Sequence, residues 1–293
     1  MERIDDDMLL DELRKRLEEN KIALSNLRSM TQTLESMNEK LRQSEALKSD
    51  FLSNIRNEII NPLTAILGIS RQVAARKADA AEAAEMAQTI YDAAFELDFQ
   101  LRNIFAAAEL EAGDVDRSIA KVDVAALVHG QIEAFRHKAA EKKVTIEFSC
   151  ETEPGLSFKT DPDKLQKIVA NLLANAIEFN LEGKRVLVRL WIENKRLNIS
   201  FSDEGLGIPE ADRKKVFDRF VQLDSGVSKR HKGHGLGLSI TKALTEMLEG
   251  SVSLTSGQGA GCVFTVSVPE SESDQDVTSG NGNEFIFEGG TQF

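Results

Sequence analysis

The chain has 293 residues, of which 41% are hydrophobic and 29% are charged. This composition supplies enough apolar side chains for a packed core and excludes a chain that is disordered throughout. Its 36 Lys and Arg residues stand against 48 Asp and Glu residues, a formal net charge of -12. That charge would repel the phosphate backbone of nucleic acid, so we expect no nucleic-acid partner.

The longest uncharged stretch in the first half, Ile59 to Ser70, is shorter than the ~20 apolar residues of a membrane helix. We therefore expect no membrane segment in this chain and a cytoplasmic location. The two cysteines, Cys150 and Cys262, are too few and too far apart for a disulfide framework or a zinc site. We expect both to be buried thiols.

Residues 1–43 predict a coiled-coil signalling helix, because leucines recur there at heptad-like spacing. The leucines of this stripe are Leu10, Leu13, Leu17, Leu24, Leu27, Leu34 and Leu41. A parallel homodimer would bury the stripe. The alternative is a single amphipathic helix packed against a domain. Since the heptads are present from the start of the chain, we expect an input from an upstream sensor domain or from a partner.

Residues 44–112 predict a helical hairpin. The apolar face widens through Ile59, Leu63 and Leu67, Pro62 should kink this first helix, and a second helix ends before Gly113. Two antiparallel helices cannot bury both of their faces alone. Dimerisation into a four-helix bundle would solve this problem.

Residues 118–269 predict an α/β sandwich, so the overall fold class is α+β. Asp123 is expected to cap a helix that runs to about Lys142, followed by a strand over 144–150, a helix over 163–179 and strands near 185–193 and 196–203. A helix over 235–248 and strands over 251–256 and 262–268 complete the unit. Residues 270–293 are expected to form a flexible tail, in which 285–287 could dock on a surface.

Three polar residues of the 163–179 helix, Asn171, Asn175 and Glu178, fall on one face at helical spacing. Amides in this arrangement can hold a hydrated magnesium ion and phosphate oxygens. The alternative is a solvated helix face.

Two glycine-rich segments follow, one at 203–208 directly after a strand and one at 233–238 directly before a helix. Closely spaced glycines let backbone N–H groups approach a phosphate chain, and a helix N-terminus adds partial positive charge. Asp203, buried at a strand end, could accept a hydrogen bond from an exocyclic amine. Either segment alone is also typical of an ordinary turn.

Taken in order, Asn171 to Phe179 resembles the N-box, 217–220 resembles the phenylalanine box, and the two glycine segments resemble the glycine boxes of sensor histidine kinases and the wider GHKL superfamily. This resemblance implies an ATP-binding domain with ATP and Mg2+ as ligands. It implies that Asn175 is the magnesium ligand, that Asn171 contacts phosphate and that Asp203 binds the adenine amine.

The same resemblance implies further ATP-binding residues in the boxes and in a mobile lid. These residues are Gly205, Gly207, Ile208, Phe220, Lys232, Gly233, His234, Gly235, Leu236, Gly237 and Leu238. Lys229 and Arg230 could also offset phosphate charge, or belong to a solvated basic loop. Glu178 departs from the family, whose N-box usually has Lys or Arg there. Either Glu178 turns outward, or nucleotide binding is altered.

The hairpin resembles the dimerisation and phosphoacceptor domain of the same kinases, with Asn57 in place of the acceptor histidine. The lone pair of a carboxamide nitrogen is delocalised, so the nitrogen is not nucleophilic. Asparagine therefore keeps a side chain of similar shape at this position but cannot accept phosphate from ATP. In the family, an acidic residue at the position of Glu58 acts as a base. The residue at the position of Asn61 orients a water molecule that hydrolyses a phosphoaspartate. Ser53 could in principle accept phosphate, although a surface hydroxyl is the simpler interpretation.

The resulting hypothesis is a homodimeric two-component signalling protein that binds Mg-ATP, communicates with a response regulator receiver domain and has lost self-phosphorylation at Asn57. One alternative is a pseudokinase or a response-regulator phosphatase that acts as an ATP-gated binding partner. A further alternative is a kinase that phosphorylates a histidine of a partner kinase in a heterodimer.

Overall fold

The computed structural model describes residues 6–75, 79–113, 116–152, 155–222, 235–257 and 259–272. Several side chains on the first helix, including those of 43–58, are outside this description. The chain divides into two units, residues 1–54 and residues 55–293. Within the described ranges, every helix is too short or too polar to cross a lipid bilayer.

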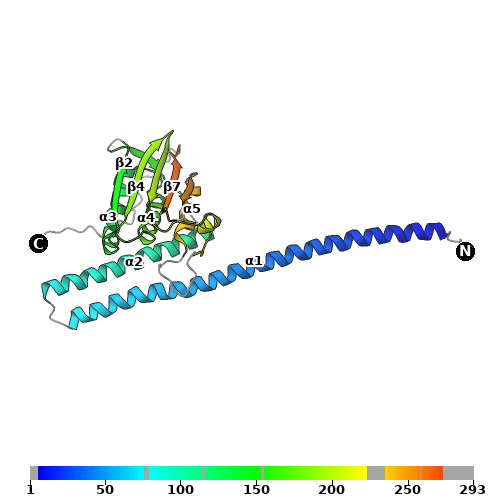
Figure 1. The fold of residues 1–293 in the computed structure, drawn as a ribbon, viewed down its shortest axis with the longest axis horizontal. Helices are drawn as coiled ribbons and strands as arrows, with labels where there is room; N and C mark the ends of the chain where they lie inside the picture. The colour runs from blue at the N-terminus through cyan, green and yellow to red at the C-terminus, as the bar shows by residue number, and fades with distance from the viewer. Residues whose placement is uncertain are drawn as a thin grey trace. The chain divides into compact units, whose positions relative to one another are not determined.

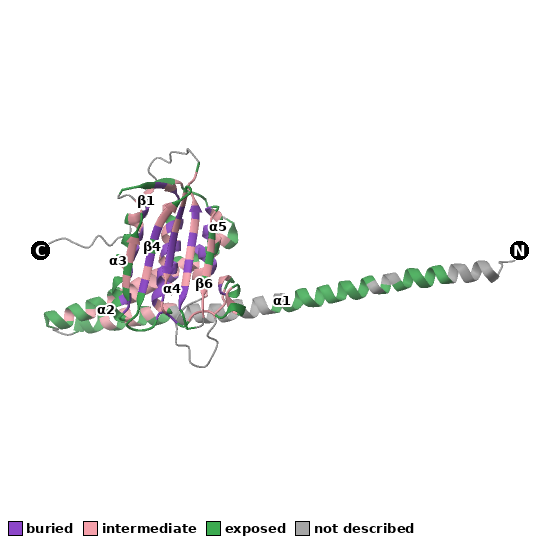
Figure 2. Cartoon of the chain, turned by 45° about the horizontal axis from the view of Figure 1, so that its top comes forward, coloured by how far each residue is buried: buried purple, intermediate pink, exposed green. Residues whose placement is uncertain are grey.

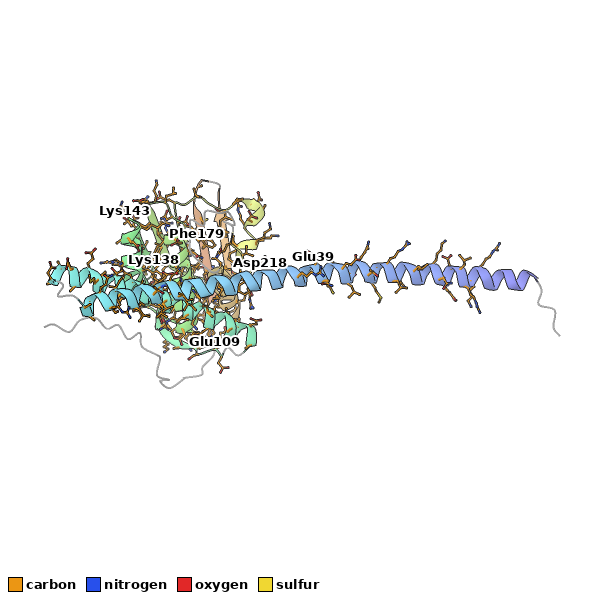
Figure 3. All side chains as sticks on the ribbon, turned by 90° about the horizontal axis from the view of Figure 1, so that it is seen from below. Glu39, Glu109, Lys138, Lys143, Phe179 and Asp218 are labelled. Carbon is orange, nitrogen blue, oxygen red and sulfur yellow. The ribbon has the colours of Figure 1, made fainter. Side chains whose placement is uncertain are left out.

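The first unit is formed by the N-terminal part of helix α1 (Asp6–Ala75). The described side chains of this part, including Glu39, project away from the helix (Figure 3). The described leucines of the heptad stripe, Leu17, Leu24, Leu27 and Leu34, are 58–66% exposed in the single chain. An apolar stripe that is exposed in one chain is typical of a helix that pairs with another helix.

The second unit begins with the rest of α1, which contains Pro62, and with helix α2 (Ala80–Ala112). Asp79 caps α2, since its Oδ1 accepts hydrogen bonds of 2.9 Å from the N–H groups of Ala81 and Glu82. Gly113 ends the helix in the left-handed conformation with φ 72°. The predicted end before Gly113 is confirmed.

The main sheet has five strands in the order β2-β4-β5-β7-β6 (Figure 1). The strands are β2 (Thr145–Cys150), β4 (Arg185–Glu193), β5 (Arg196–Ser202), β6 (Ser251–Ser256) and β7 (Cys262–Pro269). β2 pairs with β4 in parallel, and the other neighbours are antiparallel. Along β7, buried and half-buried residues alternate, because successive side chains point to opposite faces of a sheet.

Three helices cover this sheet, namely α3 (Val124–Glu141), α4 (Pro162–Glu178) and α5 (Gly237–Met247). They pack side by side with α4 in the middle. The buried residues lie between this helical layer and the sheet (Figure 2). The α/β sandwich that the sequence predicts is therefore present, and Asp123 caps α3 through a 2.9 Å hydrogen bond from the Ala126 N–H.

Helices α2 and α3 pack together through aromatic rings that lie far apart in the sequence. The ring of Phe135 lies edge-on to those of Phe95 and Phe99, with centroid distances of 5.2 and 5.5 Å. Beside them, the Lys138 ammonium donates to the Glu96 carboxylate at 2.8 Å. Phe135 lies on the face of α3 that is turned toward α2, and these contacts bury it.

Three features differ from or add to the predictions. Strands β1 (Ala120–Asp123) and β3 (Ser157–Thr160) form a small antiparallel sheet that was not predicted. Two short 3-10 helices, Glu210–Asp212 and Lys215–Phe217, follow the first glycine segment. The expectation that both cysteines are buried is wrong for Cys150, which lies at the exposed end of β2, the edge strand.

Candidate functional site

Helix α4 carries the segment that resembles the N-box, and the start of this helix is fixed by buried charges. Asp161 caps the helix by accepting a 3.0 Å hydrogen bond from the Lys164 N–H, and its Oδ2 lies 2.6 Å from the Lys164 ammonium. That ammonium also donates to the Asp116 carbonyl. Pro162 at the first helical position suits the fixed φ of proline. This start sets the register in which the polar residues of α4 face the rest of the domain.

Asn171 is buried on α4, with 2% of its surface exposed. Among the described residues, neither its Oδ1 nor its Nδ2 has a hydrogen-bond partner. A Cβ atom added to Gly237 would lie 3.6 Å from this Oδ1, so the amide faces the first residue of α5. Since an unsatisfied buried polar group costs ~1–3 kcal/mol, this amide is suited to a polar ligand rather than to a solvated helix face.

Asn175 and Glu178, one and two turns further along α4, are half-buried. The Lys142 ammonium, at the end of α3, donates to the backbone carbonyl of Glu178. Burial lowers the pKa of Lys142, and the nearby charge of Glu178 opposes that effect. A cation beside the last turn of a helix stabilises its unpaired carbonyls. Lys142 thus holds the end of α4 next to the N-box side chains.

Asp203 follows β5 directly and is 6% exposed. Its Oδ1 accepts hydrogen bonds from the backbone N–H groups of Gly205, at 2.9 Å, and Cys262, at 3.2 Å. Burial raises the pKa of this carboxyl, while these two hydrogen bonds lower it in part. Among the described residues, Oδ2 has no hydrogen-bond donor, which leaves one carboxylate oxygen available to a ligand.

The first glycine box packs so closely that side chains are excluded at two of its positions. A Cβ atom at Gly205 would lie 2.2 Å from the carbonyl oxygen of Phe179, which caps α4. Gly207 has φ 76°, and a Cβ atom there would lie 2.0 Å from the Gly257 carbonyl. Glycine is the residue that satisfies both conditions. The box is therefore pressed between the end of α4 and the β6–β7 turn.

Ser256 ties this box to the β6–β7 turn. Its hydroxyl accepts a 2.8 Å hydrogen bond from the Ile208 N–H and donates to the Gly261 carbonyl at 2.9 Å. The guanidinium of Arg213 donates to the Ser256 carbonyl at 2.5 Å. Sequence reasoning missed Ser256 and Arg213, because neither belongs to a local motif.

The second glycine box is described only from Gly235 onward. The Phe220 N–H donates to the Gly235 carbonyl at 3.0 Å, and both residues have positive φ, 67° and 66°. Helix α5 begins at Gly237, two residues later than predicted, with Leu236 buried and Leu238 half-buried. The remaining predicted lid residues lie outside the described residues, namely Lys229, Arg230, Lys232, Gly233 and His234.

The hairpin residues Asn57, Glu58 and Asn61 all lie on α1, where positions 57 and 61 are one helical turn apart. Asn61 is exposed, whereas the side chains of the other two are outside the described set. Among the described side chains, Asn61 has no hydrogen bond or ion pair with the group around Asp203. The structure brings the N-box, the first glycine box and the start of α5 together.

Two cavities in the described part of the chain lie away from this site. One, of about 370 Å³, is lined by residues such as Arg117, Thr160 and Glu249. The other, of about 320 Å³, lies near the start of α4 and is lined by Asp161 and Lys164 among others. Neither includes Asn171 or Asp203. The candidate site is therefore identified from its polar groups and its close backbone contacts, and not from either of these cavities.

Comparison with known proteins agrees with this arrangement. The family of histidine kinase-, DNA gyrase B-, and HSP90-like ATPases matches residues 160–272, which run from β3 through β7. The chain is 30% identical over 230 residues to the circadian input-output histidine kinase CikA of Synechococcus elongatus, covering 78% of this chain and 30% of CikA. It is 31% identical over 233 residues to the autoinducer 2 sensor kinase/phosphatase LuxQ of Vibrio vulnificus, covering 78% and 27%.

Among solved structures, full-length ShkA in complex with AMPPNP is similar, with a TM-score of 0.55 and 26% identity over 75% of this chain and 45% of that chain. The chain spans less than a third of the length of the two curated relatives. Sequence, fold and the matched ATPase domain agree. The chain therefore carries in its C-terminal half a domain of the histidine kinase-, DNA gyrase B-, and HSP90-like ATPase family, and over most of its length it is similar to sensor histidine kinases.

Proposed function

We propose that this chain binds Mg-ATP between α4 and the first glycine box, and that it serves a two-component pathway as a homodimer that communicates with a response regulator receiver domain. The observation that carries the proposal is the buried amide of Asn171, which has no partner among the described residues and faces Gly237. The AMPPNP complex of ShkA and the matched ATPase family support a nucleotide as the occupant.

Each site residue has a role that its chemistry allows. The free Oδ2 of Asp203 would accept a hydrogen bond from the adenine amine, beside Gly205, Gly207 and Ile208. Asn171 would contact phosphate, and the amide oxygen of Asn175 would bind magnesium. The ion, when bound, neutralises phosphate charge.

The second glycine box would close over the phosphates. It comprises Gly233, His234, Gly235, Leu236, Gly237 and Leu238, follows the lid residue Lys232, and is contacted by Phe220 through the Gly235 carbonyl. The N-terminus of α5 adds partial positive charge on that side. Lys142 beside Glu178 places a cation near the N-box, where the chain has a carboxylate instead of the usual basic residue.

Self-phosphorylation is expected to be absent because Asn57 has no nucleophilic nitrogen. Phosphatase chemistry toward a receiver domain needs no acceptor histidine, and Glu58 and Asn61 remain available as a base and as a water-orienting amide. The name of the relative LuxQ, a sensor kinase/phosphatase, supports this second activity. A pseudokinase that only binds its partner, with ATP as an allosteric ligand, is the alternative.

We further propose the domain plan of a coiled-coil helix over 1–43, a dimerisation hairpin over 44–112, an ATP-binding domain over 118–269 and a tail from 270. The exposed leucine stripe of α1 supports pairing of two chains. In the tail, the Ser271 N–H donates to the Lys159 carbonyl at 3.0 Å. Residues 273–293, with the 285–287 segment, lie outside the described residues.

Calorimetry with ATP, with and without Mg2+, tests the nucleotide site. The wild-type chain should bind ATP, and N175A should lose the magnesium-dependent part of that binding. Incubation with γ-labelled ATP should leave the chain unlabelled, and addition of a phosphorylated receiver domain should lead to its dephosphorylation. ATP binding that N175A leaves unchanged would remove Asn175 from the site. Receiver binding without turnover would favour the pseudokinase.

A further inference from the structure

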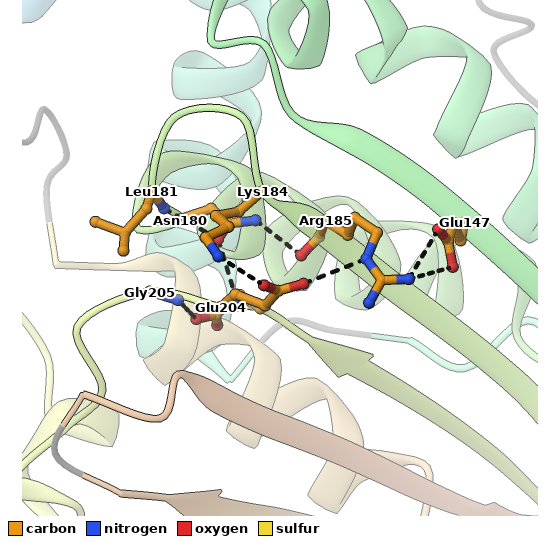
Figure 4. Close-up of polar contacts among 8 residues, drawn as sticks. Glu147, Asn180, Leu181, Lys184, Arg185, Glu204 and Gly205 are labelled. Atoms are coloured by element: carbon orange, nitrogen blue, oxygen red, sulfur yellow. Dashed lines mark hydrogen bonds and ion pairs between the residues drawn. The ribbon is translucent and has the colours of Figure 1, made fainter.

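Asn180 follows the cap of α4 and is 3% exposed. Its Oδ1 accepts hydrogen bonds from the N–H groups of Leu181, at 3.0 Å, and Glu204, at 3.1 Å. Its Nδ2 donates to the Arg185 carbonyl at 2.9 Å (Figure 4). One buried side chain therefore joins the end of α4, the start of β4 and the first glycine box.

The bond to Glu204 is the one that bears on the site, because Glu204 is the next residue after Asp203. The next residue of the loop, Gly205, is in close contact with the Phe179 carbonyl. The segment from Asp203 to Gly205 is thus held by the amide of Asn180 and by the end of α4. A shift of the loop would move the Asp203 carboxylate with it.

The charged groups around this loop are exposed and hold it less firmly. The Glu204 carboxylate lies 3.4 Å from the Lys184 ammonium and 3.4 Å from Nε of Arg185, and the same guanidinium reaches Glu147 at 3.2 Å (Figure 4). Exposed ion pairs contribute ~0–1 kcal/mol each, whereas an unpaired buried backbone N–H costs ~1–3 kcal/mol. The buried amide, rather than this ion-pair network, decides where the loop lies.

We infer that Asn180 is a positioning residue that sets the specificity of the site for 6-aminopurine nucleotides by holding Asp203 in register, an inference that rests on the proposed ATP site. Oδ2 of Asp203 can accept a hydrogen bond from the 6-amino group of ATP. Inosine triphosphate, ITP, carries a carbonyl oxygen at that position. This oxygen and Oδ2 of Asp203 are both hydrogen-bond acceptors, so they cannot form a hydrogen bond with each other. Discrimination between ATP and ITP therefore reports the position of Asp203, and binding of ITP reports the rest of the site.

The test measures the dissociation constants of ATP and ITP, both with Mg2+, for the full chain and three variants. The wild-type chain should bind ATP at least about tenfold more tightly than ITP, since a hydrogen bond to a charged group is lost with ITP. N180A should bring the ratio close to one and leave the affinity for ITP within about twofold. N180D keeps an acceptor toward Glu204 but turns a carboxylate oxygen toward the Arg185 carbonyl, so it should keep only part of the discrimination.

N198A is the matched control. Asn198 on β5 also donates to a backbone carbonyl, that of Arg196, at 3.1 Å, but it makes no contact with the first glycine box. N198A should leave the ATP to ITP ratio unchanged, whatever its effect on thermal stability. Should N180A not fold, N180S takes its place, because its hydroxyl is too short to reach Glu204.

One result overturns the inference and is distinguishable from failure of the proposed function. If the wild-type chain prefers ATP and a folded N180A or N180S keeps that preference, Asn180 does not position Asp203. If the wild-type chain binds neither nucleotide, the proposed ATP site is wrong, and the role of Asn180 falls with it.

Discussion

The Oδ1 of Asp203 accepts a hydrogen bond of 3.2 Å from the backbone N–H of Cys262, which lies 59 residues later in the chain and begins β7. In return, the Asp203 N–H donates to the Cys262 carbonyl at 2.9 Å. A Cβ atom at Gly261, just before, would lie 2.0 Å from the Asp203 carbonyl oxygen. The carboxylate of the candidate site is therefore held by the start of β7 and by the β6–β7 turn, in addition to the contact that Asn180 makes with the next residue, Glu204.

Replacement of Asp203 by Asn should change how stability depends on pH. Burial raises the pKa of Asp203, so the folded chain binds this proton more readily than the unfolded chain. The free energy of unfolding therefore falls as pH rises from the ordinary pKa of an aspartate to the raised pKa of Asp203 in the folded chain. D203N lacks this effect and should gain stability relative to wild type toward neutral pH, while ATP affinity falls.

Urea unfolding of both proteins between acid and neutral pH measures this difference. The stability gap should be small at low pH, where both side chains are neutral, and should increase with pH. A gap that is independent of pH, or one that shrinks as pH rises, would show that the raised pKa of Asp203 does not act on folding.

Alanine at position 205 should displace the first glycine box. The added Cβ would meet the Phe179 carbonyl at 2.2 Å, a backbone group that cannot rotate away. We expect G205A to lose about 1–3 kcal/mol of unfolding free energy and to bind ATP less tightly. Gly130 is the matched control, since it lies on α3 and a Cβ there meets nothing within 4 Å. G130A should gain about 0.5–1 kcal/mol.

Thermal or urea unfolding, with ATP calorimetry on both variants, checks this pair. A G205A protein with wild-type stability and affinity would mean that the loop can move without effect on the site.

Replacement of Asn171 by Leu should stabilise the chain and remove nucleotide binding. The two side chains have similar size, and the native amide is buried without a partner among the described residues. Loss of that unpaired polar group should raise the unfolding free energy by about 1–3 kcal/mol, while the phosphate contact disappears. A loss of stability in urea unfolding of N171L without ATP would indicate that the Asn171 amide is satisfied in solution.

Replacement of Asn57 by histidine should give self-phosphorylation if the ATP machinery is intact. An imidazole nitrogen has an available lone pair near neutral pH, which a carboxamide lacks. Incubation of N57H with γ-labelled ATP should label the chain, while N57Q, which keeps an amide, and N57H/N175A should remain unlabelled. Silence of N57H with ATP binding retained would place the loss of activity elsewhere, for example at Glu178.

Local patterns in the sequence were sufficient to predict most elements. Asp123 and Gly113 mark a helix start and a helix end, because capping depends on neighbours only a few residues away. The period of the apolar residues predicts α4 and the strands of the main sheet for the same reason. The pairing of β1 with β3 was not predicted, since each strand has only four residues and its partner is distant in the chain.

The amino-acid sequence by itself determined the resemblance to sensor histidine kinases, the order of the candidate ATP-binding motifs and the presence of Asn57 where that resemblance places the acceptor histidine. Only the tertiary structure decided that Asn180 contacts the residue after Asp203, that Asn171 is buried without a partner among the described residues, and that Cys150 is exposed. The reason is physical. Motif spacing follows from residues that are close in the chain, whereas burial and hydrogen-bond satisfaction depend on which distant segments the fold brings together.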